Sequence, residues 1–187
     1  SVDTADAEAA RKGLSMTDKK PILNSISLEA ERFEAMRPLL DDFECRVIAL
    51  LMSDEGTPTG MDDRLSRAED LITRLTDAGR EHEEIIVDPC FLPVSTDPSN
   101  GRTVVDAIAE IHRRWPEVHI GGGCSNISFG LPKRLFVNFA LLSQAIYHGM
   151  DAGLIDPCVP DIRETILAAE AVAGRDDFCM NYVTAMR

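Results

Sequence analysis

Short apolar runs alternate with longer amphipathic segments along the whole chain. The runs are too short for stable isolated helices, and we interpret them as buried strands. They lie at residues 21–27, 46–52, 84–87, 118–120 and 152–155, and residues 1–4 resemble the end of a further strand. The segments that predict helices lie at residues 5–16, 28–43, 65–79, 103–115, 132–147 and 162–173, with a helical tail through residue 182.

Residues 46–52 form an almost uninterrupted apolar run, which is typical of a strand buried on both faces of a parallel sheet. Six strand-helix units in strict alternation therefore predict one α/β domain with an all-parallel sheet. Eight such units close a (β/α)8 barrel, and the same order also suits an open doubly wound sheet. Within the helix predicted at 28–43, Pro38 should produce a kink or split it into two segments.

Composition and charge narrow the class of protein. The 187 residues are 44% hydrophobic but only 5% aromatic, which suits one globular domain with an aliphatic core. A formal charge of -13 argues against nucleic-acid or anionic-membrane partners and favours small molecules or other proteins. The chain has no apolar run of membrane-spanning length and no signal-peptide pattern, so we expect a cytoplasmic protein. The five cysteines include no CxxC pair, and we expect reduced thiols.

A polar residue follows the last apolar position of each predicted strand. These residues are Asp3, Asn24, Ser53 with Asp54, Asp88, Asn126 and Asp156. In a (β/α) barrel the carboxyl ends of all strands meet at one mouth, so these side chains should converge on a common ligand and line one cavity. Carboxylates and carboxamides suit a flat heterocycle with an amidine-like edge, because a carboxylate accepts two neighbouring N–H groups.

Each of these residues also has a plainer interpretation. Asp88 and Asp156 both precede proline and could simply be turn residues. Asn24 could cap the following helix, although Ser25 and Ser27 are better placed to do so. Cys90, Cys124 and Cys158 lie within two residues of predicted strand ends, where they could form a zinc-thiolate site. Packing is the commoner role of such cysteines, and we predict no metal.

Four segments carry a resemblance to a known family: residues 24–29, 87–89, 123–132 and 155–157. In this order they resemble the pterin-binding methyltransferases that include methyltetrahydrofolate:corrinoid protein methyltransferase. That family is similar in fold to the folate domain of cobalamin-dependent methionine synthase and to dihydropteroate synthase. The resemblance implies a complete (β/α)8 barrel, of which residues 1–187 would supply about the last six units, with the first two units absent.

The resemblance also implies roles for individual residues and for partners. Asp3, Asn24 and Asp88 match residues that hold the amino-pyrimidine edge of the pterin, and Asn126 matches the amide near N5. Gly123 and Ser125 match contacts beside Asn126, and Arg134 matches a basic residue close to the p-aminobenzoate-glutamate side. The implied reaction moves a methyl group between tetrahydrofolate and cobalamin carried by a corrinoid protein. We also expect the protein to form a homodimer. The alternatives are a dihydropteroate synthase-like enzyme, which needs more positive charge near Lys133 and Arg134, or a non-catalytic pterin-binding subunit.

Overall fold

The computed structural model describes residues 1–187 and contains one five-stranded, entirely parallel sheet. Its strands are β1 (Val2–Asp3), β2 (Ile22–Leu28), β3 (Arg46–Ser53), β4 (Ile85–Asp88) and β5 (His119–Ile120). The spatial order of the strands equals their order in the chain. A doubly wound sheet reverses this order at a switch point, whereas a barrel advances by one strand at each crossover. The fold is therefore part of a (β/α) barrel.

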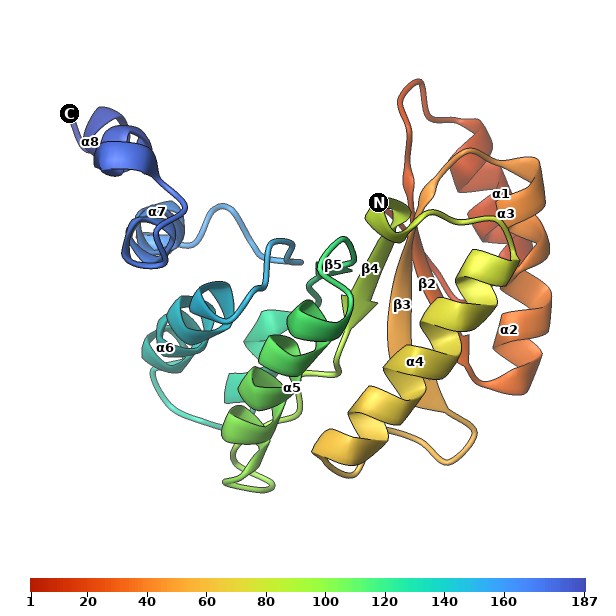
Figure 1. The fold of residues 1–187 in the computed structure, drawn as a ribbon, viewed down its shortest axis with the longest axis horizontal. Coiled ribbons are helices and arrows are strands. Elements are labelled where there is room, and N and C mark those ends of the chain that lie inside the picture. The colour runs from red at the N-terminus through yellow and green to blue at the C-terminus, as the bar shows by residue number, and fades with distance from the viewer.

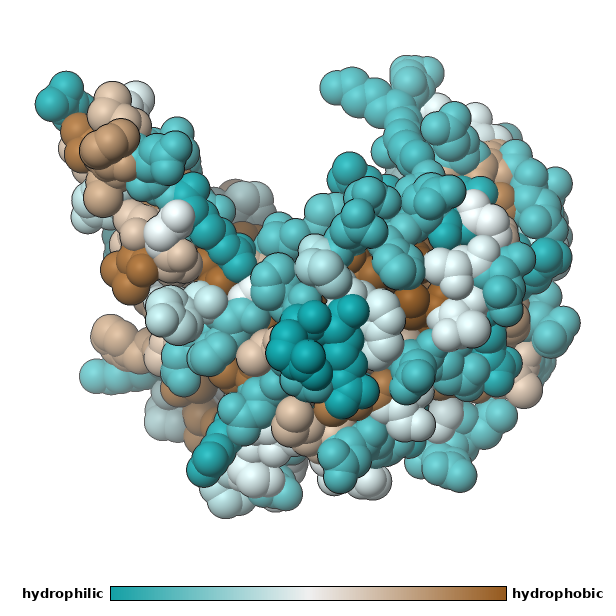
Figure 2. All heavy atoms as spheres, in the orientation of Figure 1, coloured by the Kyte–Doolittle hydropathy of each residue, from teal (hydrophilic) through white to brown (hydrophobic).

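The helices follow one another around the sheet (Figure 1). They are α1 (Ala7–Ser15), α2 (Ala30–Met36), α3 (Pro38–Asp42), α4 (Met61–Asp77), α5 (Asn100–Arg114), α6 (Arg134–Tyr147), α7 (Ile162–Val172) and α8 (Met180–Ala185). Three 3-10 helices, η1 (His82–Glu84), η2 (Cys124–Ser128) and η3 (Asp177–Cys179), complete the chain. Helices α7 and α8 extend away from the sheet, and Figure 2 shows an open notch between them and the rest of the molecule.

The core is aliphatic and lies between the sheet and its helices. In β3 the alternate residues Val47, Ala49 and Leu51 are fully buried, and Ile48 on the opposite face is also buried. The apolar face of α4 covers the sheet, with Leu71 and Leu75 completely enclosed. Each such Leu or Ile side chain contributes about 1.5 to 3 kcal/mol through burial, which fixes the positions of the strand ends that carry the site. None of the helices is both long enough and apolar enough to span a membrane.

The helix predicted at residues 28–43 is split at Pro38, as expected, into α2 and α3. Proline stands at the first position of α3, where its missing N–H costs nothing. The caps differ from expectation, because neither Ser25 nor Ser27 caps α2. Instead, the carboxylate of Asp54, from the loop after β3, accepts the N–H of Ala30 at 3.2 Å.

The strand predicted at residues 152–155 is not formed, so the sheet has five strands and not six. The segment still runs beside the end of β5, since the N–H of Ala152 donates to Ile120 O at 3.1 Å and that of Leu154 donates to Gly122 O at 3.0 Å. The chain continues from β5 through three glycines instead of a longer strand, and the segment has a neighbour on one side only. A regular strand needs a more continuous series of backbone hydrogen bonds to its neighbours than this segment makes. The apolar composition of the segment does not show whether these bonds can form.

The prediction that a polar residue ends every strand was only partly correct. Asp3, Ser53 and Asp88 are the last residues of β1, β3 and β4. Asn24 is instead the third residue of β2, because the buried Ile26 carries that strand on to Leu28. Asn126 lies in η2, six residues beyond β5, and Asp156 lies in a turn after residues that form no strand.

Candidate functional site

The carboxyl group of Asp88 stands at the carboxyl end of β4 and marks the centre of the candidate site. Its Oδ1 accepts the N–H of Cys90 at 2.9 Å, the geometry of an Asp turn. Burial raises the pKa of Asp88 to about 6, although the N–H groups of Cys90 and Gly123 lower it. Neither donor is a cation. Asp88 is therefore a partly desolvated carboxylate whose charge is held only by backbone N–H groups.

Glycine at position 122 is what makes room for this carboxylate. A Cβ atom on Gly122 would overlap the Asp88 carboxyl group. The two residues come together because Gly121 N–H donates to Val87 O at 2.9 Å, which continues the β4–β5 pairing beyond β5. The carboxylate thus lies directly against the backbone at residue 122, a close approach that only glycine permits.

The chain runs directly from this backbone into η2 and carries three of the predicted site residues, Gly123, Ser125 and Asn126. The side-chain Nδ2 of Asn126 lies 3.2 Å from the position that a Cβ on Gly123 would occupy. Ser125 and Asn126 are both exposed. The structure therefore brings Asp88, Gly123 and Asn126 to one short stretch of backbone, with Asp88 half-buried and Asn126 open to solvent.

Arg134, at the start of α6, is engaged within the protein. Its Nη2 donates to the Ser125 carbonyl at 2.7 Å and its Nε donates to Ser128 Oγ at 2.9 Å. The guanidinium also lies over the exposed ring of Phe129, 4.6 Å from its centroid. These contacts tie α6 to the η2 turn that carries Asn126.

Asp3 and Asn24 form a second pair on the neighbouring strands. They are register partners between β1 and β2, and Thr4 N–H donates to Asn24 O at 3.1 Å. Asp3 is exposed and Asn24 is 8% exposed. β3 lies between this pair and Asp88 in the sheet. The expectation that one cavity is lined by Asp3, Asn24, Asp88 and Asn126 remains a prediction.

No three His, Cys, Asp or Glu side chains in the molecule are grouped so that they could hold a metal ion. Cys90 and Cys124 are buried while Cys158 is exposed. Burial, and to a smaller extent the Asp88 carboxylate, raise the pKa of both buried thiols to about 12. Asp156, like Asp88, accepts the N–H two residues on, from Cys158 at 2.9 Å, so its role as a turn residue is realised.

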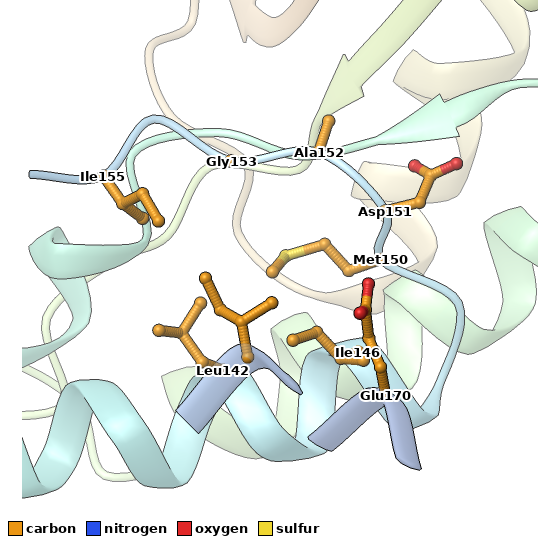
Figure 3. A pocket seen from close by; sticks show the side chains of 9 residues that line it. Leu142, Ile146, Met150, Asp151, Ala152, Gly153, Ile155 and Glu170 are labelled. Atoms are coloured by element: carbon orange, nitrogen blue, oxygen red, sulfur yellow. The ribbon is translucent and has the colours of Figure 1, made fainter. Parts of the chain in front are cut away.

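An apolar pocket of about 120 Å³ lies elsewhere, between α6, α7 and residues 150–155 (Figure 3). Leu142, Ile146 and Met150 line it, and Glu170 enters from α7. Asp151 points away from it and pairs with His119 Nδ1 at 2.6 Å. The pocket contains none of the predicted site residues. The candidate site is therefore defined by the positions of Asp88 and Asn126 and not by this pocket.

Residues 1–156 match the model of a protein family described as "Pterin binding enzyme". The chain belongs to this family. Among relatives of this pterin binding enzyme is a methylcorrinoid:tetrahydrofolate methyltransferase of Eubacterium limosum, 28% identical over 100% of this chain and 69% of that protein. A methionine synthase of Mycobacterium tuberculosis is 26% identical over 82% of this chain, which corresponds to 14% of that protein.

Solved structures of similar fold are dihydropteroate synthases. The enzyme of Coxiella burnetii in complex with pteroic acid superposes with a TM-score of 0.70 at 19% identity, covering 91% of this chain and 66% of that one. The Yersinia pestis enzyme gives 0.65 at 18% identity, covering 92% and 67%. The chain thus spans about two thirds of these proteins, and at this identity the likeness establishes the barrel fold alone.

Two features of the site were not predicted from the sequence. Gly122 was not singled out, since its contact with Asp88 is not local. Arg64 is a 1% exposed arginine whose guanidinium contacts the residues after Asp88. Its signal was present, because Arg64, Ala68, Leu71 and Leu75 share the spacing of the buried face of α4.

Proposed function

We propose that this protein transfers a methyl group between N5 of a tetrahydrofolate and a corrinoid carried by a partner protein. The observation that carries the proposal is the similarity to a methylcorrinoid:tetrahydrofolate methyltransferase along the entire chain. The geometry of Asp88, Gly122 and Asn126 supports it, because these residues offer the polar groups that a pterin needs within one length of backbone.

In this proposal Asp88 binds the amino-pyrimidine edge of the pterin. An ionised carboxylate accepts two parallel N–H groups, and Asp88 has only two backbone donors and no cationic partner. The flat ring would lie beside the backbone at Gly122 and Gly123, where the Asp88 carboxyl group and the Asn126 amide both pack against the glycines. Asp3 and Asn24 contribute at the same edge of the pterin, from β1 and β2. Residues 1–187 act as one pterin-binding domain.

Asn126 acts at N5, where the chemistry takes place. Removing a methyl group from a tertiary amine requires positive charge on nitrogen, and the exposed amide of Asn126 hydrogen-bonds near that atom. Ser125 and Gly123 add contacts beside it. Arg134 holds the turn through Ser125 and Ser128, and its stacked guanidinium lies close to where the p-aminobenzoate-glutamate side of the carrier would pass. The corrinoid supplies the cobalt that accepts or donates the methyl group, while the barrel supplies placement and electrostatics.

Single-turnover methyl transfer between methylcobalamin and tetrahydrofolate tests this proposal, with equilibrium binding of tetrahydrofolate measured in parallel. Asn126→Ala should slow transfer at saturating pterin by about 30- to 1000-fold, the value of one hydrogen bond directed at developing charge. Asp88→Ala should mainly weaken binding, because its contact exists in both ground and transition states. The exposed Asn181 on α8 provides the control variant Asn181→Ala, which should change neither quantity.

An unchanged transfer rate in Asn126→Ala would leave that residue with a binding role only. If the wild-type protein instead condenses a pterin pyrophosphate with p-aminobenzoate, it is a dihydropteroate synthase-like enzyme. Tetrahydrofolate binding without either reaction, in the presence of a corrinoid protein, would identify a non-catalytic pterin-binding subunit.

A further inference from the structure

The buried arginine Arg64 lies behind the loop that follows Asp88. Its Nε donates to Pro89 O at 2.8 Å, its Nη2 to Cys90 O at 3.2 Å and its Nη1 to Gly60 O at 3.0 Å. All three acceptors are backbone carbonyls, and none is a carboxylate. Enclosing a guanidinium without a counter-ion is costly, and burial lowers the pKa of Arg64. The buried guanidinium of Arg64 therefore acts through the directions of its hydrogen bonds and not through an ion pair.

That geometry leads directly to the candidate site. The Pro89 carbonyl, which receives Arg64 Nε, and the Cys90 N–H, which donates to Asp88 Oδ1, are the two ends of the same peptide group. A peptide group is planar, so fixing the direction of its carbonyl also fixes the direction of its N–H. Arg64 also holds the carbonyl on the other side of Cys90. It thus controls both peptide groups of this residue.

The conformation of Cys90 requires such support. Its φ is 60°, in the left-handed region that a residue with a side chain seldom adopts. Without the guanidinium, rotation of the chain at Cys90 toward a common conformation would turn the N–H away from Asp88. The carboxylate would then lose one of its two backbone donors.

We propose that Arg64 is a positioning residue, which orients the Asp88 carboxylate for pterin binding by holding the Pro89–Cys90 peptide in place. The inference rests on the proposed function for the pterin and on the structure alone for the position of Asp88. Lysine cannot replace the planar guanidinium, because a single ammonium does not reach three carbonyls from two loops in fixed directions.

Arg67 offers a matched control one helical turn further along α4. It is 7% exposed and also donates to backbone carbonyls, those of Leu51 and Gly56, and it pairs with Asp63. Its contacts hold the loop after β3 and do not include Pro89 or Cys90. Arg64→Lys and Arg67→Lys therefore disturb equally buried arginines of the same helix, but only the first releases the peptide that contacts Asp88.

The first measurement is the titration of the Asp88 carboxyl by carbon NMR, assigned with Asp88→Asn. The titratable groups facing Asp88 are the thiols of Cys90 and Cys124, which stay neutral because their pKa values are about 12. A hydrogen bond to the ionised form lowers a carboxyl pKa, so losing the Cys90 N–H should raise the pKa of Asp88 in Arg64→Lys. It should stay at the wild-type value in Arg67→Lys.

The second measurement is the dissociation constant of tetrahydrofolate, with the single-turnover rate at saturating pterin. Arg64→Lys should weaken binding by about 10-fold and leave the rate within about 3-fold, while Arg67→Lys should leave binding within about 2-fold. If Arg64→Lys is unstable, Arg64→Gln removes the buried charge, keeps an amide donor and should give the same two changes.

An unchanged Asp88 titration and unchanged affinity in folded Arg64 variants would overturn the proposal, as would equal changes in the Arg64 and Arg67 variants. The proposed function fails in a different way. If wild-type protein does not bind tetrahydrofolate although the pKa of Asp88 still rises in Arg64→Lys, Arg64 positions the carboxylate for a ligand other than a pterin.

Discussion

Among single side chains, Asp88 has a pKa that makes the free energy of unfolding depend on pH. Its carboxyl has a pKa of about 6 in the folded chain against an ordinary value of 3.8. Between these two values the native state binds more protons than the unfolded state, so the free energy of unfolding falls as pH rises. Above about pH 6 the full cost of holding an ionised carboxylate in this partly desolvated place is present.

Asp88→Asn should remove this cost while keeping an oxygen to accept the Cys90 N–H. The variant should be more stable than wild type near neutral pH by up to about 3 kcal/mol, and the difference should vanish below about pH 4. Urea unfolding of both proteins across this pH range measures it. A stability difference that does not depend on pH would show that Asp88 titrates normally.

The sequence predicted these residues unevenly. Asp88 was predicted as a site residue because it ends an apolar run, and Asn126 because its surroundings resemble a family motif. The pKa of Asp88 could not be predicted, since burial, which raises it, and the Gly123 N–H, which lowers it, both involve the chain after β5 or the fold as a whole. The internal hydrogen bonds of Arg134 were likewise hidden, because they depend on the fold of η2.

Among the elements, the segment at residues 151–155 owes its position to a close approach between its backbone and Gly121. A Cβ on Gly121 would lie 2.6 Å from the carbonyl carbon and oxygen of Ala152. The extended chain after α6 is therefore seated directly on the glycine that follows β5. Two of its N–H groups donate to Ile120 O and one to Gly122 O, which aligns it with β5 without forming a regular strand.

Gly121→Ala should push this segment off the edge of β5 and lower the free energy of unfolding by about 1 to 3 kcal/mol, the usual effect of overpacking. Gly153→Ala is the control in the same segment, since a Cβ there finds its nearest atom at an ordinary 3.7 Å. It should change stability by no more than about 0.5 kcal/mol. Equal losses in the two variants, measured by urea unfolding, would mean that the approach of Gly121 to Ala152 is not important.

Elements that depend on the residues within them were predicted well, and elements that depend on contacts with distant parts of the chain were not. The apolar run of β3 and the break at Pro38 are both visible in the chain itself. β2 agrees with the strand predicted at residues 21–27, but Asn24 was wrongly expected to be its polar end, because pairing with β3 carries the strand through Ile26 to Leu28. Residues 152–155 have the composition of a strand, but they make only some of the backbone hydrogen bonds that a strand needs.

For the molecule as a whole, the exposed apolar residues gather toward the C-terminus. Val172 is 79% exposed and Phe178 is 96% exposed, and Met180 is also exposed. These residues belong to α7, η3 and the start of α8, the part of the chain that reaches furthest from the sheet in Figure 1. Large aromatic and aliphatic side chains left in water are typical of surfaces that bind another protein.

We expect a second copy of the chain to cover this surface. The double substitution Val172→Ser and Phe178→Ser should weaken self-association at least about 10-fold, because aromatic side chains dominate such contacts. Light scattering over a range of protein concentrations measures the association. Met16→Ser alters a similarly exposed residue at the end of α1 and should have no effect. A wild-type protein that stays monomeric at high concentration would contradict the expectation.

The two buried thiols beside Asp88 have a consequence for chemical selectivity. An activated methyl group reacts readily with thiolates, so an enzyme that handles one is at risk of methylating itself. Cys90 and Cys124 are thiols whose pKa values the Asp88 carboxylate raises, and this charge together with burial keeps both protonated at any physiological pH. In the proposed methyl transfer, the carboxylate that binds the pterin would therefore also keep these thiols from competing for the methyl group.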